Sequence, residues 1–169
     1  MARARSTVDT TLSIFPVYRV GGIIGVYYVT SFSMEYSINP WAVLAAAVST
    51  MIVGSLWYGP LFGKMWMKLS GLTRESMKSM PLTAPQAMGL GLVTALMTAY
   101  VLAHIADAFM VFDTTSAFQM AFWLWFGLAV PFTAGAWLWE GKSFKLFVLN
   151  AAHWLVSLTA VSVILAYWR

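Results

Sequence analysis

GSLWYGPLFGKMW, residues 54–66, separates a long apolar segment from a short basic one. Trp and Tyr side chains favour the boundary between membrane and water, whereas a Gly-Pro pair ends a helix and cations stay in water. The stretch therefore predicts that a helix beginning near Trp41 leaves a bilayer here. Interfacial anchoring does not explain the close spacing of Gly59, Pro60 and Gly63. We therefore also expect a fixed turn that returns the chain against other helices.

The composition indicates a membrane protein. The chain has 169 residues, of which 60% are hydrophobic and 9% are charged, and its mean hydropathy is +0.75. A soluble domain carries about 25% charged residues, so this chain lacks the polar surface that water requires. The net charge is +4, but the cations lie between apolar segments rather than in one run. They are typical of topology signals and contacts with anionic lipids, and we expect no nucleic-acid partner.

Four apolar segments predict an all-α integral membrane bundle of four transmembrane helices within a domain of residues 34–169. Each segment is close to the length of about 20 residues that a bilayer requires. Asn39-Pro40 suits a helix start, and Pro131 should kink the third span. The expected spans are residues 39–58, 86–106, 116–139 and 144–167.

Residues 1–33 form an N-terminal extension with three open interpretations. Arg3 and Arg5 precede an apolar stretch interrupted by Pro16 and Arg19. The extension could be a signal-like segment, a fifth spanning helix in which Arg19 is costly, or sequence upstream of a true start at Met34.

Lys and Arg residues predict the orientation of the chain, because cytoplasmic loops are enriched in them. The first core loop has four such residues, Lys64, Lys68, Arg74 and Lys78, and the third has Lys142 and Lys145. The second loop has none. We therefore expect the first and third core loops in the cytoplasm and the C-terminus outside, most simply in a bacterial inner membrane.

Two polar sets lie within the expected spans. Ionisable residues at membrane depth are functional candidates by default. They could line a polar path, although hydrogen bonds between helices would also explain them. The sets are Tyr100, His104 and Asp107 on the second span and Asn150, His153 and Ser157 on the fourth.

Small residues recur every four positions along the second span. Such a stripe lets helix backbones approach closely in lipid, and we expect it to contribute to a homo-oligomer. Its members are Gly91, Ala95, Ala99 and Ala103.

Recognised catalytic patterns are absent. The chain has no cysteine, which excludes disulfides and thiolate chemistry. It also has no phosphate-binding glycine loop, no His-Glu-x-x-His and no Gly-x-Ser-x-Gly. We expect no cofactor, no metal and no catalytic residue. The remaining classes are a small transporter or channel-like protein, a structural or accessory membrane subunit, and, third, an enzyme acting on lipid-soluble substrates.

The pattern around residues 54–66 resembles a family of small integral membrane proteins, the domain of unknown function 1761. The resemblance starts near Met34 and is most specific from Gly54 to Trp66. It implies a four-helix membrane domain and no particular activity. The residues that carry it are Asn39, Gly54, Trp57, Tyr58, Pro60, Gly63 and Trp66.

Overall fold

The computed structural model describes residues 38–168, without the side chain of Arg74. These residues belong to one compact unit that contains helices and no strand. The expectations for residues 1–33, including the fifth helix, and the choice of Met34 as start lie outside the described residues. The elements in chain order are α1 Pro40–Leu56, η1 Trp57–Leu61, α2 Gly63–Ser70, α3 Arg74–Lys78, α4 Ala84–Ala108, α5 Thr114–Leu124, η2 Trp125–Ala129, α6 Val130–Trp139 and α7 Phe144–Tyr167, where η marks a π-helical turn.

Within residues 38–168, four helical stretches are long and apolar enough to cross a membrane, which confirms the predicted all-α class. They cover Pro40–Leu61, Ala84–Ala108, Thr114–Trp139 and Phe144–Tyr167. The fourth matches the predicted limits, and the others begin or end within three residues of them. The capping residues explain this agreement. Asn39 accepts a hydrogen bond from the Trp41 amide at 3.0 Å, and Asp113 accepts one from the Ser116 amide at 2.9 Å.

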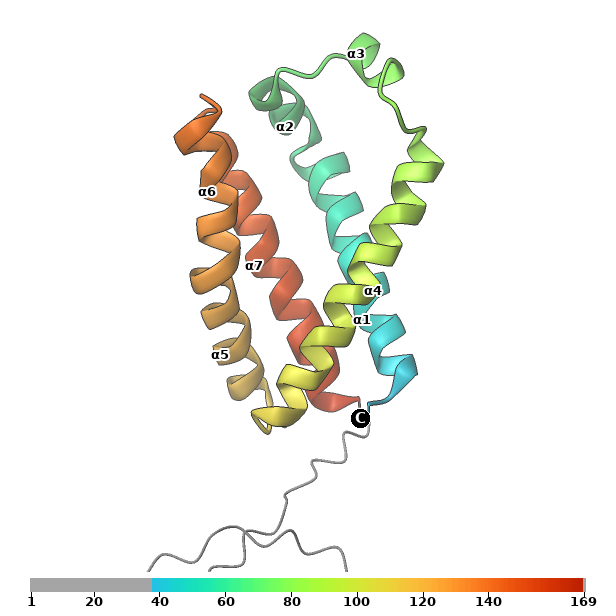
Figure 1. Cartoon of the computed structure of the whole chain (residues 1–169), viewed down its shortest axis with the longest axis vertical. Helices are drawn as coiled ribbons and strands as arrows, with labels where there is room; N and C mark the ends of the chain where they lie inside the picture. The colour runs from blue at the N-terminus through green and yellow to red at the C-terminus, as the bar shows by residue number, and fades with distance from the viewer. Residues whose placement is uncertain (1–37, 169) are drawn as a thin grey trace, which may run out of the picture. The chain divides into compact units, whose positions relative to one another are not determined.

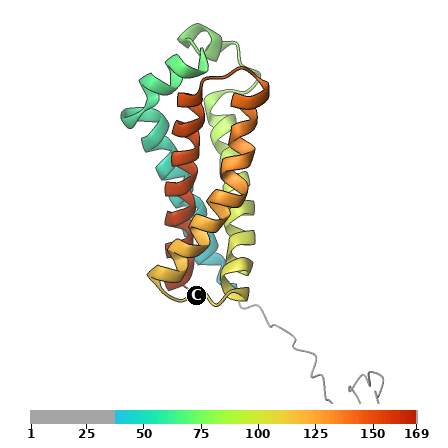
Figure 2. The ribbon, with the colours of Figure 1, turned by 90° about the vertical axis from the view of Figure 1, so that its left-hand side faces the viewer.

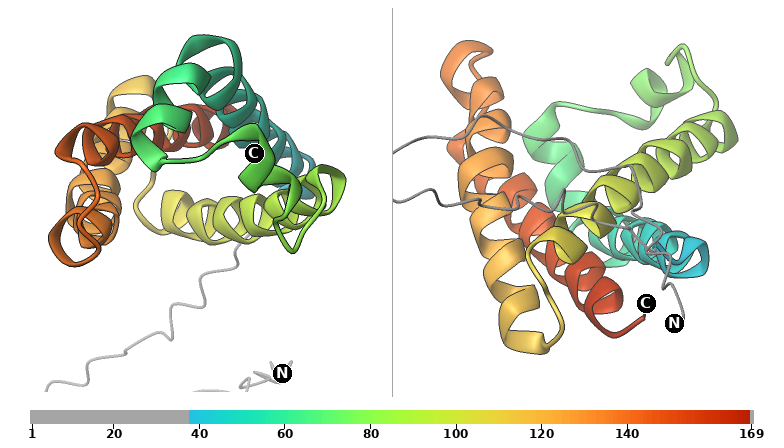
Figure 3. Two further views of the ribbon diagram at one scale, coloured as in Figure 1. Left: turned by 90° about the horizontal axis from the view of Figure 1, so that it is seen from above. Right: turned by 60° about the horizontal axis from the view of Figure 1, so that its bottom comes forward.

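Consecutive spans run in opposite directions (Figure 1). α2, α3 and the α6–α7 turn lie at one end, and the α4–α5 loop and the end of α7 lie at the other. Figure 2 shows the third span, α5–η2–α6, crossing α7. α7 packs against both α1 and α5 and lies between the third span and α1 (Figure 3).

Alanine side chains form much of the contact between α1 and α4. Ala46 of α1 and Ala99 of α4 are 0% and 1% exposed, and Met51 of α1 faces Gly91. Hydrocarbon tails are as apolar as leucine, so helices in lipid gain most from close backbone approach. The small-residue stripe thus serves packing within the chain.

This placement changes the expected role of the stripe in assembly. Ala95, Ala99 and Ala103 are all buried inside one protomer. A second copy could reach them only if α1 moved away from α4. Homo-oligomer formation stays a prediction, but its contact surface has to lie elsewhere.

The first span breaks at the Gly-Pro pair, as the sequence predicts. α1 passes into η1, where Gly59 has the non-helical angles φ −103° and ψ −107° and Pro60 follows it. The amide of Phe62 donates to the carbonyl of Trp57 at 2.9 Å, and α2 begins at the next residue. A Cβ atom on Gly63 would lie 2.6 Å from the Tyr58 carbonyl oxygen. Only glycine fits this approach without a backbone shift.

The third span contains its irregular turn just before Pro131. η2 occupies residues 125–129, and Pro131 falls in the first turn of α6. Pro131 nevertheless lies inside the continuous helical stretch Thr114–Trp139, where a proline removes one backbone hydrogen bond. The sequence predicted an interruption here, and the structure accommodates it as a π-helical turn.

We expect Ala99→Leu to destabilise the protomer, because three added carbon atoms must enter the closed contact with α1. Overpacking of this kind costs about 1–3 kcal/mol. Ala87→Leu is the matched control, because Ala87 is exposed on the same helix. Thermal unfolding in detergent should show a lower Tm for Ala99→Leu. Equal Tm values for both variants would contradict the α1–α4 packing.

We expect Gly63→Ala to disturb the return of the chain after Pro60, because the new methyl group would collide with the Tyr58 carbonyl. The control is Gly89→Ala, because a Cβ on Gly89 meets nothing within 4 Å. The control should be neutral or stabilising by up to about 1 kcal/mol, given the helix propensity of alanine. Gly63→Ala should lower the Tm, and a Tm equal to that of Gly89→Ala would disprove the steric account.

Candidate functional site

Residues 57–58 meet the polar stripe of α7. The Tyr58 hydroxyl donates to Oδ1 of Asn150 at 3.1 Å. On its other side, the Tyr58 ring packs against Trp66 of α2, with ring centroids 5.4 Å apart. The broken first span is therefore fixed to α7 by a hydrogen bond and to α2 by an aromatic contact.

His153 lies beside this hydrogen bond and is half-buried. Its ring centroid is 4.8 Å from that of Tyr58 and 6.0 Å from that of Trp57. Its Nε2 atom is 3.4 Å from the Ser157 hydroxyl, and Ser157 is only 2% exposed. We call these five residues, Trp57, Tyr58, Asn150, His153 and Ser157, the Tyr58–His153 cluster.

Gly54 explains how α1 accommodates the imidazole. A Cβ on Gly54 would lie 3.6 Å from Nε2 of His153, which is ordinary van der Waals contact. A larger side chain at this position would occupy the space next to Nε2. Gly54 thus keeps the α1 side of His153 free of a side chain.

The Trp57 indole is the unexplained part of the cluster. Its Nε1 atom is buried and has no hydrogen-bond partner, whereas buried donors in proteins are nearly always paired. The ring itself packs against Phe62, with centroids 4.6 Å apart. Trp57 therefore carries a buried donor without a partner next to His153.

The cluster has the chemistry of a polar relay made of uncharged groups. It offers hydroxyl, amide, indole and imidazole groups, and it contains no carboxylate and no lysine or arginine. Of these, imidazole is the group that can both take up and release a proton near neutral pH. Among residues 38–168, no three His, Cys, Asp or Glu side chains are placed to hold a metal ion.

The second predicted set lies elsewhere. The ring centroids of Tyr100 and His104 are 4.5 Å apart, and Nδ1 of His104 is 2.9 Å from the Tyr100 carbonyl oxygen of the same helix. His104 lies four residues from the end of α4, whereas His153 lies nine residues from the opposite end of the bundle. At 1.5 Å per residue, the two histidines are about 15 Å apart along the bundle. They therefore cannot share one ligand.

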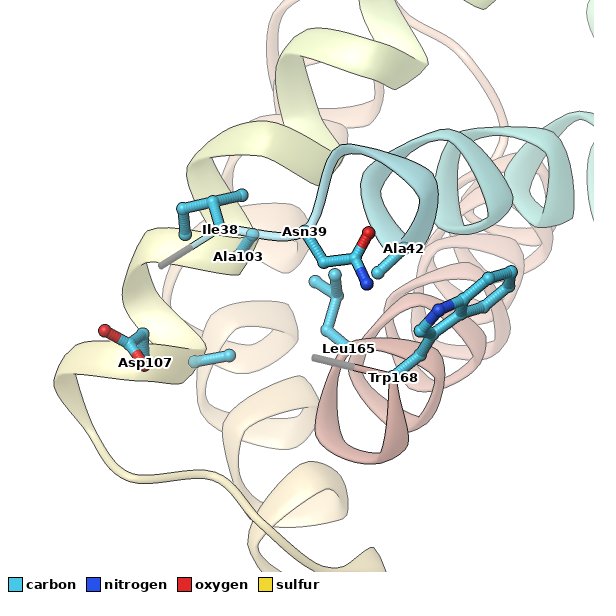
Figure 4. A pocket seen from close by; sticks show the side chains of 8 residues that line it. Ile38, Asn39, Ala42, Ala103, Asp107, Leu165 and Trp168 are labelled. Atoms are coloured by element: carbon cyan, nitrogen blue, oxygen red, sulfur yellow. The ribbon is translucent and has the colours of Figure 1, made fainter. Parts of the chain in front are cut away.

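Asp107 belongs to a small pocket at the same end of the bundle as His104. This pocket has a volume of about 30 Å³ and is also lined by Asn39, Ala42, Leu165 and Trp168. Figure 4 shows the Asn39 amide directed toward Ala42 and Trp168, and the Asp107 carboxylate on the opposite side. The volume suits about one water molecule, which is too small for a solute. Asn39 mainly caps α1.

Sequence reasoning missed one contact of α7. Nε1 of Trp125, in η2, donates to the Ala151 carbonyl at 2.7 Å. The only signal was the aromatic richness of the third span, which does not identify the tryptophan that turns inward. Reasoning from spacing did group Asn150, His153 and Ser157, but it did not identify Trp57 and Tyr58 as their neighbours.

The comparison with protein families identifies one family. A family model described as "Protein of unknown function (DUF1761)" matches residues 41–166. Searches of curated proteins and of solved structures found no significant match. The matched range covers all four spans and the whole Tyr58–His153 cluster. The chain is therefore a member of the DUF1761 family.

Proposed function

We propose that the protein is a small transporter or channel-like protein in which the Tyr58–His153 cluster is the polar site of the path. The observation that carries the proposal is the meeting of a broken first span with three polar side chains of α7. Interrupted helices form the ion and substrate sites of many membrane transporters, and π-helical turns are frequent at functional sites.

The depth of the cluster supports this proposal. His153 is the tenth of 24 residues in α7, which places it about 14 Å from the start of the helix. This is about half of a hydrocarbon core of about 30 Å. A histidine is costly at such depth unless it is paired or lines a polar path. Its partners in the cluster make proton transfer through His153 the most direct chemistry.

A proton or small polar solute would meet these groups in sequence. The Tyr58 hydroxyl and Asn150 lie on the side nearer α2, and Ser157 lies one turn further along α7. Nε2 of His153 stands between the Ser157 hydroxyl and the space kept by Gly54. The unpaired Trp57 N–H would bind an acceptor atom of water or of the solute.

The accessory-subunit alternative also has a supporting observation. The Tyr58–Asn150 hydrogen bond and the aromatic contacts of His153 join α1 to α7, which is a structural role in itself. Such bonds contribute about 0.6–2 kcal/mol in membranes. Under this alternative the cluster stabilises the fold and conducts nothing.

We expect wild-type protein in proteoliposomes to carry protons when a potassium diffusion potential is applied, as reported by an internal pH-sensitive dye. His153→Gln should lower the rate at least about tenfold, which is about 1.4 kcal/mol. The control His104→Gln should retain the flux, because His104 lies outside the cluster. Folded wild-type protein that gives no flux above empty liposomes would favour the accessory alternative.

We also propose that α2, α3 and the α6–α7 turn face the cytoplasm of a bacterial cell, with the C-terminus outside. Two charge observations support this orientation. The loops at that end of the bundle contain six Lys and Arg residues, Lys64, Lys68, Arg74, Lys78, Lys142 and Lys145, and the loop at residues 109–113 contains none. Cytoplasmic loops are enriched in these cations.

Cysteine labelling tests this orientation. The natural chain has no cysteine, so within this protein the label reports only the introduced residue. Ser79 and Thr115 are exposed at opposite ends of the bundle. In intact cells, a membrane-impermeant maleimide should label Thr115→Cys at once and Ser79→Cys only after permeabilisation. The reverse labelling order would show that the chain is threaded the other way.

A further inference from the structure

An apolar groove lies between α4 and the third span, with α7 as its floor. Its volume is about 480 Å³, which falls in the range of about 300–1,000 Å³ typical of ligand pockets. α4 packs mainly against α1, and the third span packs mainly against α7, so these two walls are separate (Figures 1 and 3). We infer that the groove holds an acyl chain of an anionic phospholipid whose headgroup contacts Lys142 and Lys145.

The lining selects hydrocarbon. The buried part of the lining includes Leu102 of the α4 wall and Leu158 of the α7 floor, which are 5% and 7% exposed, whereas Phe132 at the rim is 78% exposed. The two hydroxyl groups of the lining are already used. Thr98 donates to the Thr94 carbonyl at 3.0 Å, and Thr133 donates to the Ala129 carbonyl at 2.6 Å. The protons of both hydroxyls are therefore engaged, so these groups offer a polar occupant only acceptor lone pairs. The rest of the lining is mostly hydrocarbon.

The positive charge at the α6–α7 turn favours an anionic headgroup. α6 and α7 provide one wall and the floor, and the turn that joins them carries Lys142 and Lys145 against the single carboxylate of Glu140. Both lysines are exposed. Basic residues at an anionic membrane surface are attracted to its headgroups. The nearest lining residues, Thr133 and Trp154, lie about 9 and 15 Å from this turn along their helices.

These distances match a lipid of the same leaflet. Half of a hydrocarbon core is about 15 Å deep, so a chain anchored at the α6–α7 turn reaches the part of the groove lined by Phe132, Thr133 and Trp154 without crossing the bilayer midplane. A second protein copy fits less well. Copies in one membrane share an orientation, so a partner seated here would bring its own Lys142 and Lys145 to the same level.

Native mass spectrometry of the delipidated full chain tests this inference. Palmitoyl-oleoyl phosphatidylglycerol and phosphatidylcholine are the two probes. We expect one phosphatidylglycerol per protomer, bound at least about tenfold more tightly than phosphatidylcholine. Equal binding of the two lipids would contradict the headgroup assignment.

Thr98→Phe fills the groove, and Thr94→Phe is its matched control. Both threonines bond to a carbonyl of their own helix, but only Thr98 lines the groove. Thr98→Phe should weaken phosphatidylglycerol binding about tenfold, and Thr94→Phe should change it less than about twofold. If Thr98→Phe fails to fold, Val101→Phe replaces it, with Val93→Phe as control. Equal loss in both members of a pair would disprove the groove as the site.

A second pair of variants tests the charge. Lys142→Gln with Lys145→Gln should reduce the preference for phosphatidylglycerol to within about twofold. Lys64→Gln with Lys68→Gln removes the same charge from α2 at the same end of the bundle and should leave the preference intact. A preference that survives the first pair would overturn the headgroup contact. A protein dimer that Thr98→Phe dissociates would instead identify a second copy as the occupant.

Discussion

Two side-chain hydrogen bonds to consecutive residues of α7 connect it to two other spans. The Tyr58 hydroxyl donates to the Asn150 side chain, and the Trp125 indole donates to the Ala151 carbonyl. Both donors belong to π-helical turns, η1 and η2. A π-helical turn redirects the side chains that follow it, and here each turn brings an aromatic donor onto the same level of α7. These two hydrogen bonds set the positions of the first and third spans along the axis of α7. The rest of the arrangement depends on those positions.

The first span makes two kinds of contact, one through small residues and one through polar residues. Towards its start, Ala42 and Ala46 are buried in the alanine-rich core that also contains Ala99. At the end of the first span, Gly54 of α1 and Trp57 and Tyr58 of η1 lie beside His153 of α7. The first contact holds the backbone close to its neighbours, and the second places polar groups at membrane depth. A single helix thus joins the best-packed part of the protein to its candidate site. Residues 54–66 lie where the alanine-rich packing of the first span ends and its polar contacts with α7 begin.

The sequence predicted the elements better than their partners. The span limits could be predicted because apolar segments begin next to residues that cap helices, namely Asn39, Asp113 and Ser143. The stripe from Gly91 to Ala103 was recognised as a packing surface, but a stripe does not show whether its partner is another helix of the same chain. Likewise, the spacing of Asn150, His153 and Ser157 identified one face of α7. It could not show that this face meets Tyr58 rather than His104, because that choice depends on the π-helical turn at residues 57–61 and on the fit of Gly63 against the Tyr58 carbonyl.

Residues 54–66 are docked on α7 by the hydrogen bond between Tyr58 and Asn150. A double-mutant cycle with Tyr58→Phe and Asn150→Ala, read out by reversible unfolding in detergent and denaturant, measures that contact directly. We expect a coupling free energy of about 0.6 kcal/mol and no more than about 1.7 kcal/mol, the average and the maximum for hydrogen bonds between membrane helices. Effects that add within about 0.3 kcal/mol would mean that the two side chains do not interact, and the proposed docking of the broken span on α7 would be wrong.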